Sequence, residues 1–275
     1  DVLDTWFSSA IWPLSALGWP HQTNTLKKFF PNSVLLTGHD ILFFWVTRMI
    51  MVCEYITGEV PFKEVSLQGL IFGKSFWKEN AEGDVTYISE EAKGSDIFSK
   101  WEKMSKSKGN VIDPLQMITT YGTDAVRMTL TSSASQNPQI DLDKRRFEEF
   151  KNFANKLWNG SRFVLSNINL SKKDLEENLS NLNIEDQWIL NKLNSSIQEI
   201  TTFLDNYQFD KASLKGYSFF WDDFCAYYLE ISKPILLHNS SQSVTKQKIL
   251  IIVLNSLIRL MHPFAPFITE EIFHL

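Results

Sequence analysis

The chain has 275 residues, of which 44% are hydrophobic and 13% aromatic, and this is enough apolar material for a sizeable core divided over two domains. Its net charge of −5 is spread over both halves, with 15 basic and 19 acidic groups in 1–150 and 12 and 13 in 151–275, which excludes a bulk basic field and confines any contact with RNA to local patches. Cys53 and Cys225 stand in no CxxC or Cys/His spacing, and no run approaches eighteen apolar residues, so the sequence argues against a zinc site, a disulfide framework and a membrane span.

The first predicted element, at 1–18, is a short apolar segment that runs into a Ser, Trp and Pro stretch. Pro13 falls inside it, and a proline removes a helical hydrogen bond and clashes with the preceding turn, so this segment is predicted not to be one continuous helix. On residue type alone, Trp6, Phe7 and Trp12 are expected in an aromatic core.

Residues 33–53 have the pattern of a strand, a tight turn and a helix. A β-branched and leucine run at 34–37 precedes Gly38-His39-Asp40, and helical spacing follows from Ile41 onward. In a parallel α/β sheet such a junction places ligands at the carboxyl end of the strand, where free backbone N–H groups and the helix dipole face the crevice. Gly38 lets the backbone approach a ligand closely, and Asp40 either caps the helix or accepts hydrogen bonds from a ribose.

The stretch after this junction predicts one more strand and an elaboration of the sheet. Ile41 and Trp45 are four residues apart and so share one helix face, as a packed core pair or as the wall of a pocket. Residues 65–71 alternate and end in apolar residues, which predicts a further strand. Residues 72–102 predict a hairpin-like insertion, because 86–88 is β-prone and glycines punctuate the segment.

The stretch from Lys103 to Asn110 carries three lysines spaced by small hydroxyl residues and closed by Gly-Asn. Such a loop is rich in hydrogen-bond donors and suits a polyphosphate, although a solvated linker has the same composition. The Walker pattern GxxxxGK followed by Ser or Thr is absent from the sequence, which disfavours an ordinary P-loop NTPase. The five residues from Lys103 are letter for letter the KMSKS loop of the class I aminoacyl-tRNA synthetases, and with its flanks the chain resembles the valyl branch of that family.

This resemblance implies the chemistry of amino-acid activation. Lys106, and secondarily Lys103, would neutralise the charge that grows on the β- and γ-phosphates of ATP as pyrophosphate leaves. The backbone of Met104 would lie near the adenine, with Ser105 and Ser107 beside the nucleotide. Mg²⁺ is implied by the nucleotide and not by any visible cluster of metal ligands.

Motifs nearer the N-terminus extend the resemblance. The N-terminal DTWFSSAIWP is the valyl form of a motif that isoleucyl relatives usually write with an acid after the Trp-Phe, and TGHDI at 37–41 fits the synthetase pattern T-G-x-D-I. The further nucleotide contacts implied in this way are Gly38, His39, Asp40 (on the ribose), Leu70 and Ile71. The amino-acid pocket is implied at Trp6, Ile41 and Trp45.

Apolar residues recur at helical spacing from 143 to 165, and a wheel of about 100° per residue puts them on one broad face. Away from that face, Lys144, Lys151 and Arg162 fall within roughly 20° of each other, and Lys156 and Phe163 lie farther round. A solvated charged face is the ordinary alternative. Cations and an exposed aromatic ring are what unstacked RNA bases need, and the resemblance implies that Lys156, Arg162 and Phe163 match anticodon-loop contacts of the family, so the five residues are predicted to bind tRNA.

Three amphipathic segments follow at 184–203, 211–229 and 244–261, and HPFAPF then breaks the chain before a last helix. This pattern predicts an all-α bundle without repeats. Its landmarks, among them KxxNxxRF ending at Phe163, resemble the anticodon-binding domain of the valyl, isoleucyl, leucyl and methionyl subgroup. Ala226 and Phe273 depart from the residues that the valyl branch commonly has there, as tolerable packing changes.

The sequence therefore predicts an α/β plus all-α chain, with 1–138 as the second half of a Rossmann-like nucleotide-binding domain and 139–275 as a helical anticodon-binding domain. The parent protein would join valine to tRNA(Val) using ATP, with release of AMP and pyrophosphate, as a cytoplasmic monomer with no membrane partner. The family's second signature, HxGH, matches at none of the five histidines, and the chain begins without Met, so it is expected to be a piece of a longer protein and inactive alone. An isoleucyl-type enzyme and a non-catalytic tRNA-binding fragment are the alternatives.

Overall fold

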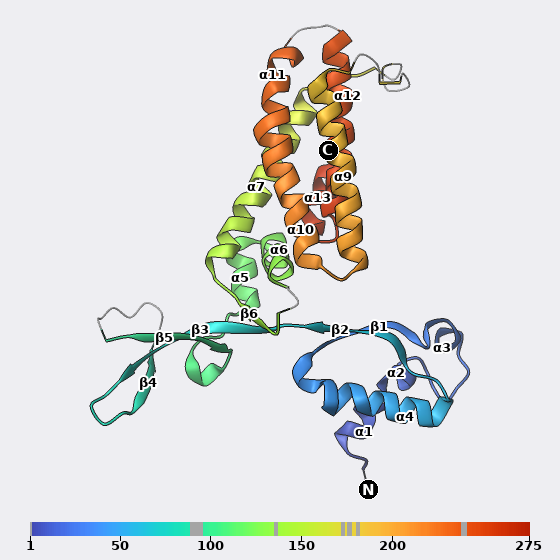
Figure 1. Ribbon diagram of the computed structural model, residues 1–275, viewed down its shortest axis with the longest axis vertical. Coiled ribbons are helices and arrows are strands. Elements are labelled where there is room, and N and C mark those ends of the chain that lie inside the picture. Colours follow the sequence, from blue (N-terminus) through green and yellow to red (C-terminus); the bar gives the residue numbers. More distant parts are fainter. Residues whose placement is uncertain are drawn as a thin grey trace. The chain divides into compact units, whose positions relative to one another are not determined.

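The computed structural model describes residues 2–88, 96–134, 137–171, 174, 178, 179, 182–237 and 241–275 (Figure 1). The chain divides into two compact units, one formed by Asp1–Ile71 with Gln136–Ile140 and the other by Phe72–Ser135 with Asp141–Leu275. No helix among these residues has both the length and the apolar character that crossing a membrane requires. Each unit is considered separately below.

The N-terminal unit combines short helices with a pair of parallel strands. Its helices are α1 (Thr5–Ala10), α2 (Trp12–Ser15), α3 (Asn24–Phe29) and α4 (Thr47–Thr57), and two irregular helical turns, η1 (His39–Ile41) and η2 (Leu42–Val46), precede α4. The strands β1 (Asn32–Gly38) and β2 (Phe62–Gln68) pair in parallel from Asn32 opposite Phe62 to Gly38 opposite Gln68. The strand and the turn predicted for 34–40 are thus confirmed. The single strand predicted for 65–71 is wrong in its bounds, because β2 ends at Gln68 and the next strand begins at Leu70.

Pro13 separates α1 from α2 and occupies the first turn of α2, where its missing N–H costs nothing. The prediction of an interrupted N-terminal segment is therefore confirmed. The expected aromatic core is wrong, because Trp6, Phe7 and Trp12 are 36%, 41% and 52% exposed. The buried positions between the helices belong instead to smaller residues, Leu14, Leu26 and Cys53 among them.

The two-stranded sheet keeps one apolar face covered and leaves another exposed. Leu35 is buried against Val46 and Met49, whereas Val34 and Leu36, on the opposite face of β1, remain 40% and 54% exposed. Parallel sheets in globular proteins are normally covered on both faces. The exposed apolar side chains of β1 therefore form a surface on which further packing is expected.

The second unit begins with an antiparallel sheet that corresponds to the insertion. Its central strand β3 (Leu70–Glu79) pairs on one side with β4 (Val85–Ile88) and on the other with β5 (Phe98–Lys103). The hairpin-like elaboration predicted for 72–102 is confirmed. Residue Gly94 of the predicted segment lies outside the described residues.

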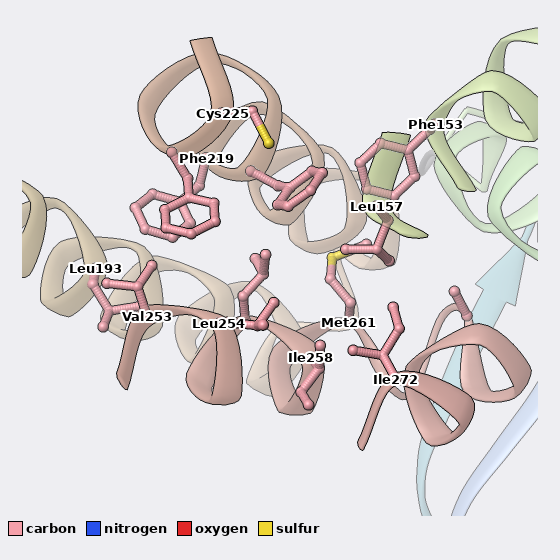
Figure 2. Packing of buried hydrophobic residues seen from close by; sticks show 14 of the residues in the cluster. Phe153, Leu157, Leu193, Phe219, Cys225, Val253, Leu254, Ile258, Met261 and Ile272 are labelled. Atoms are coloured by element: carbon pink, nitrogen blue, oxygen red, sulfur yellow. The ribbon is translucent and has the colours of Figure 1, made fainter. Parts of the chain in front are cut away.

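Helices make up the rest of this unit (Figure 1). They comprise η3 (Lys106–Lys108), α5 (Pro114–Tyr121), α6 (Thr123–Ser133), α7 (Arg145–Ser166), α9 (Ile184–Asp205), α10 (Phe209–Ser218), the π-helical η4 (Phe219–Leu229), α11 (Glu230–Leu236), α12 (Ser241–Met261) and α13 (Pro266–Phe273). A short strand, β6 (Gln139–Asp141), lies between α6 and α7 in sequence and belongs to the first unit up to Ile140. Figure 2 shows side chains such as Phe153, Leu193, Phe219, Leu254 and Ile272 converging on one apolar centre. The predicted helical bundle is thus confirmed, and these side chains form its core.

Asp124, in the first turn of α6, caps a distant helix and not its own. Thr123 and Asp124 have the composition of N-cap residues, yet Gly122 is the N-cap and no side chain caps α6. The carboxylate of Asp124 accepts hydrogen bonds from the backbone N–H groups of Phe267 and Ile268, at 3.3 and 2.7 Å, which begin α13. Because Asp124 is only 9% exposed, these orphan helix donors are satisfied away from solvent.

Inside the bundle, one carboxylate joins three elements. Asp186, at the start of α9, accepts hydrogen bonds from the Tyr228 hydroxyl at 2.8 Å, from the Asn183 N–H at 3.0 Å and from the ammonium of Lys246. Asp186 and Lys246 are 1% and 2% exposed, and Tyr228 is fully buried. Burial, and then the bond to Asp186, raise the pKa of the Tyr228 phenol far above its usual value, so it remains protonated.

Candidate functional site

The lysine loop connects β5 to α5 in the second unit. Its centre, Lys106–Lys108, is a single turn of 3-10 helix that ends at Gly109, whose φ of +66° lies in the left-handed region that glycine enters without strain. Asp113 then caps α5 by accepting a hydrogen bond from the Leu115 N–H at 3.0 Å. The loop is therefore a formed turn between two anchored elements, and the solvated-linker alternative does not describe it.

Asn110 fixes the base of the loop. Its side-chain amide donates to the carbonyl oxygens of Gly73 and Glu102, both at 3.3 Å, and its amide oxygen accepts from the Ser105 N–H at 2.7 Å. The residue is 6% exposed, so these bonds replace water at a closed position. Sequence reasoning missed Asn110 as a functional residue, although the Gly-Asn that closes the motif was the available signal.

The three lysines of the loop differ in their surroundings. Lys108 is half-buried, pairs with the carboxylate of Glu102 and lies 5.8 Å from the ring centre of Tyr87. The hydrogen bond from Lys108 holds the pKa of Glu102 below its usual value. Lys103 and Lys106 are exposed, and the Lys106 ammonium makes no hydrogen bond or ion pair with any residue that the structure describes. Of the two predicted phosphate ligands, Lys106 thus presents its ammonium to solvent.

The remaining predicted nucleotide contacts of the loop lie on the same turn. Met104 is half-buried and packs beside the small apolar cluster around Met117, and the Ser105 and Ser107 hydroxyl oxygens are 2.9 Å apart. The structure therefore brings Met104, Ser105, Lys106 and Ser107 onto one turn.

Gly38, His39 and Asp40 form the end of β1 and the turn that follows in the N-terminal unit. Gly38 is the N-cap of η1, and no side chain caps that turn, so the capping alternative for Asp40 is wrong. A Cβ on Gly38 would stand 2.7 Å from a carboxylate oxygen of Asp40, so a larger residue here would require the Asp40 side chain to shift. His39 and Asp40 are exposed at the carboxyl end of the strand, where the sequence places a ligand.

The predicted amino-acid pocket residues occupy the contact between α1 and η2. The expected regular helix from Ile41 is wrong, because 39–41 is a 3-10 turn and 42–46 is π-helical, so that α-helical geometry begins only at Thr47. Short π-helical turns of this kind are frequent at functional sites, and the four-residue spacing of an α-helix does not predict them.

The two tryptophans of this group have different partners. The Trp45 indole N–H donates to the Ser9 carbonyl at 3.2 Å. The Trp6 ring stacks at 6.4 Å on Phe44, with the Arg48 guanidinium 4.8 Å from its centre. Trp6 and Trp45 are thus held on the contacting elements α1 and η2, and Ile41 is half-buried at the end of η1, directly before η2.

Leu70 and Ile71 open β3, as predicted for a strand. The Leu70 N–H donates to the Pro138 carbonyl at 2.9 Å, so this N–H is already occupied. Ile71 is 36% exposed.

The predicted basic stripe on α7 is partly as expected. Lys144, Lys156 and Arg162 are exposed, whereas Lys151 is half-buried and donates to the Thr120 carbonyl at 3.4 Å. The prediction of an exposed aromatic ring is wrong at Phe163, which packs against the bundle core beneath the ammonium of Lys233, 5.5 Å from the ring centre. The helical wheel of α7 predicted that Phe163 faces solvent, because a projection of one helix does not include a neighbouring helix such as α11.

Both cysteines are buried free thiols, as predicted. Burial raises the pKa of Cys53 to about 11 and that of Cys225 to about 12. Among the described residues, no group of three or more His, Cys, Asp and Glu is arranged to hold a metal ion.

Comparison with known proteins identifies the family of this chain. The model for tRNA synthetases class I (I, L, M and V) matches residues 1–78 and 96–143, and the model for the anticodon-binding domain of tRNA ligase matches 186–275. The chain belongs to the class I tRNA synthetases. The KMSKS turn with its exposed Lys106, called the signature loop below, lies within the residues 96–143 that the synthetase model matches.

Curated relatives match this class I chain along its whole length. A valine–tRNA ligase of Protochlamydia amoebophila is 53% identical over 100% of the chain, and one of Chlamydia felis is 52% identical over 99% of it. In both cases the chain spans only 31% of the relative's own length.

Solved structures confirm the fold. A LeuRS–tRNA–LeuAMS ternary complex from Agrobacterium radiobacter has a TM-score of 0.66 at 21% identity, covering 100% of this chain and 31% of that one. A Mycobacterium tuberculosis methionyl-tRNA synthetase in complex with methionyl-adenylate has a TM-score of 0.68 at 19% identity, covering 98% and 49%. The predicted fold class, α/β followed by a helical bundle, is confirmed.

Proposed function

We propose that this chain is part of a valine–tRNA ligase, which activates valine with ATP and transfers it to tRNA(Val). The observation that carries the proposal is the KMSKS turn, whose base is fixed by buried Asn110 and whose Lys106 ammonium reaches solvent. Identity of 50–53% to proteins named valine–tRNA ligase supports valine as the substrate. The proposed division is 1–138 as catalytic part and 139–275 as anticodon-binding part, working as a monomer in the cytoplasm.

The reaction requires two transfers. A carboxylate oxygen of valine attacks the α-phosphorus of ATP and expels pyrophosphate, and a terminal hydroxyl of the tRNA then attacks the carbonyl carbon of the adenylate and expels AMP. During the first step negative charge grows on the oxygens of the leaving pyrophosphate, and a lysine positioned beside them stabilises that charge. We assign this role to Lys106, with Lys103 as a secondary cation.

The binding roles follow the positions described above. The proposed nucleotide contacts are Gly38, His39, Asp40, Leu70, Ile71, Met104, Ser105, Lys106 and Ser107. The proposed valine pocket comprises Trp6, Ile41 and Trp45. Because the described residues offer no cluster of metal ligands, Mg²⁺ would arrive bound to the phosphates of ATP, and none of the roles above depends on a protein-held metal.

For tRNA we propose the basic residues along α7. Lys144, Lys156 and Arg162 are exposed and can reach a phosphate or an unstacked base, Lys151 adds charge near Thr120, and Phe163 offers the part of its ring that the core leaves uncovered. If Lys144 and Lys156 touch phosphates, each replacement by alanine reduces the magnitude of the slope by about 0.7–0.9 when the logarithm of the binding constant is plotted against the logarithm of the salt concentration. An unchanged slope for both would remove them from the interface.

Valine-dependent exchange of pyrophosphate into ATP tests the activation step. In the protein as the cell makes it, Lys106→Ala is expected to slow exchange by about 10²–10³, with valine affinity nearly unchanged, because the contact forms mainly in the transition state. The 275 residues alone are expected to show no exchange, since HxGH is absent from them. Exchange that responds to isoleucine as strongly as to valine would refute the substrate assignment.

A further inference from the structure

The sheet of the insertion presents one face to the signature loop. In antiparallel pairing, directly opposed residues project from the same face, so Tyr87 and Phe98 lie on the Trp77 face of β3. Their rings meet Trp77 at 6.4 and 6.0 Å. Glu102 stands opposite Gly73, an even number of residues from this aromatic row, and so belongs to the same face.

Lys108 lies on this face. Its ammonium binds the Glu102 carboxylate on β5 and stands over the Tyr87 ring on β4. Both partners thus come from strands that flank β3, and the turn Lys106–Lys108 rests against β4. Two residues before Lys108, Lys106 points its charge to solvent.

The end of the turn is seated on the same strand. The carbonyl oxygen of Asn110 would be 2.1 Å from a Cβ on Gly73, so the loop backbone lies directly on the one position of β3 that lacks a side chain. The Asn110 side chain then ties Gly73, Glu102 and Ser105 together. The loop is therefore held at both ends of the turn.

We propose that this sheet is the seat of the signature loop, and that Glu102, Tyr87 and Asn110 are positioning residues for Lys106. Lys108 is a structural cation: its charge is committed to Glu102 and the Tyr87 ring, and it fixes the turn that carries Lys106. The match to the class I family model is interrupted between 78 and 96, the stretch that contains β4, so Tyr87 supports the loop from outside the residues that this model matches. The inference rests on the proposed function for the role of Lys106.

The kinetic test uses the protein as the cell makes it and measures valine-dependent pyrophosphate exchange. Glu102→Gln and Lys108→Met should each lower kcat about 10-fold, with the KM for valine unchanged, because a displaced catalytic group loses rate without losing substrate affinity. Lys108→Arg should restore most of the rate. The double variant should be no slower than either single variant, since both changes break the same contact.

Matched controls on the same sheet are Glu79→Gln and Lys78→Met, which change the same charges at exposed positions at the far end of β3 and should leave kcat within about 2-fold. The proposal is overturned if Lys108→Met slows exchange as much as Lys106→Ala and the double variant loses rate multiplicatively, because Lys108 would then bind phosphate itself.

Hydrogen exchange of the backbone amides at 103–110 separates this inference from the proposed function. Glu102→Gln and Asn110→Ala should speed exchange in this segment at least about 10-fold, while exchange in α9 stays unchanged and shows that the bundle is folded. If the wild-type protein lacks valine-dependent activity but these loop amides still respond, the proposed function fails and the seat stands. Loop amides that do not respond overturn the seat, whatever the activity.

Discussion

The buried carboxylate of Asp186 offers a quantitative test of how the bundle is held together. It accepts bonds from the Asn183 N–H, the Tyr228 hydroxyl and the Lys246 ammonium, and so joins α9, η4 and α12. The side chains of Asp186 and Lys246 are each 2% exposed. Replacing Asp186 by Asn keeps the size of the side chain but leaves the Lys246 cation without a counter-charge.

The expected cost follows from that burial. Removing one partner of a buried ion pair costs about 3–5 kcal/mol, because the remaining charge stays desolvated and uncompensated. The surface pair of Lys192 and Asp223, at 3.4 Å and with side chains 46% and 23% exposed, serves as control, and Asp223→Asn should cost about 0–1 kcal/mol.

Native-state hydrogen exchange measured on peptides from α9 and α12 is the assay. A loss of 3–5 kcal/mol corresponds to about 10²–10⁴-fold faster exchange where opening of these helices limits the rate, against about 5-fold or less for Asp223→Asn. The double variant Asp186→Asn with Lys246→Met should recover much of the loss, because the uncompensated charge is gone. Equal small effects of Asp186→Asn and Asp223→Asn would refute the reasoning.

Three further outcomes are expected. Asp124→Ala should destabilise the start of α13 by about 1–2 kcal/mol, because two backbone N–H groups lose their cap, and should be seen as faster amide exchange at Ile268; protection equal to wild type would contradict this. Phe163→Ala should lower the free energy of unfolding by about 2 kcal/mol, since its half-buried ring packs on the core. A loss of tRNA affinity with unchanged stability would contradict this structural role and leave Phe163 with an RNA-binding role only. The raised pKa of the Cys225 thiol, about 12 in the folded protein against 9.0, means that the unfolded chain releases this proton first as pH rises, so stability present below pH 9 is lost progressively up to pH 12. Urea unfolding should therefore show a difference between wild type and Cys225→Ala that shifts by about 1.4 kcal/mol from pH 8 to pH 10, and a pH-independent difference would count against that pKa.

Local pattern was sufficient where one element determines the geometry. Pro13 ended a helix, the apolar run before Gly38 formed a parallel strand, and the Gly-punctuated insertion formed a hairpin sheet. The KMSKS letters identified the loop and its exposed Lys106.

The sequence pattern did not predict the position of a side chain where an element distant in sequence packs against it. Asp124 has the composition of a cap for its own helix, but packing brings the N-terminus of α13 to it across 143 residues of sequence. Phe163 faces solvent on a helical wheel of α7, but in the folded protein it packs against the bundle core. The π-helical turn at 42–46 shifts Trp45 relative to Ile41 in a way that no spacing rule for α-helices contains. The seat of the loop joins Gly73, Tyr87, Glu102 and Asn110, which only strand register brings together.

The most direct test of the account is tRNA charging by the protein as the cell makes it, with ATP, total tRNA and each amino acid supplied in turn as a labelled substrate. The account predicts that valine is attached to tRNA(Val) and that Lys106→Ala removes this charging, while Lys78→Met retains it. Charging with isoleucine in preference to valine, or valine charging that is indifferent to Lys106, would contradict the account.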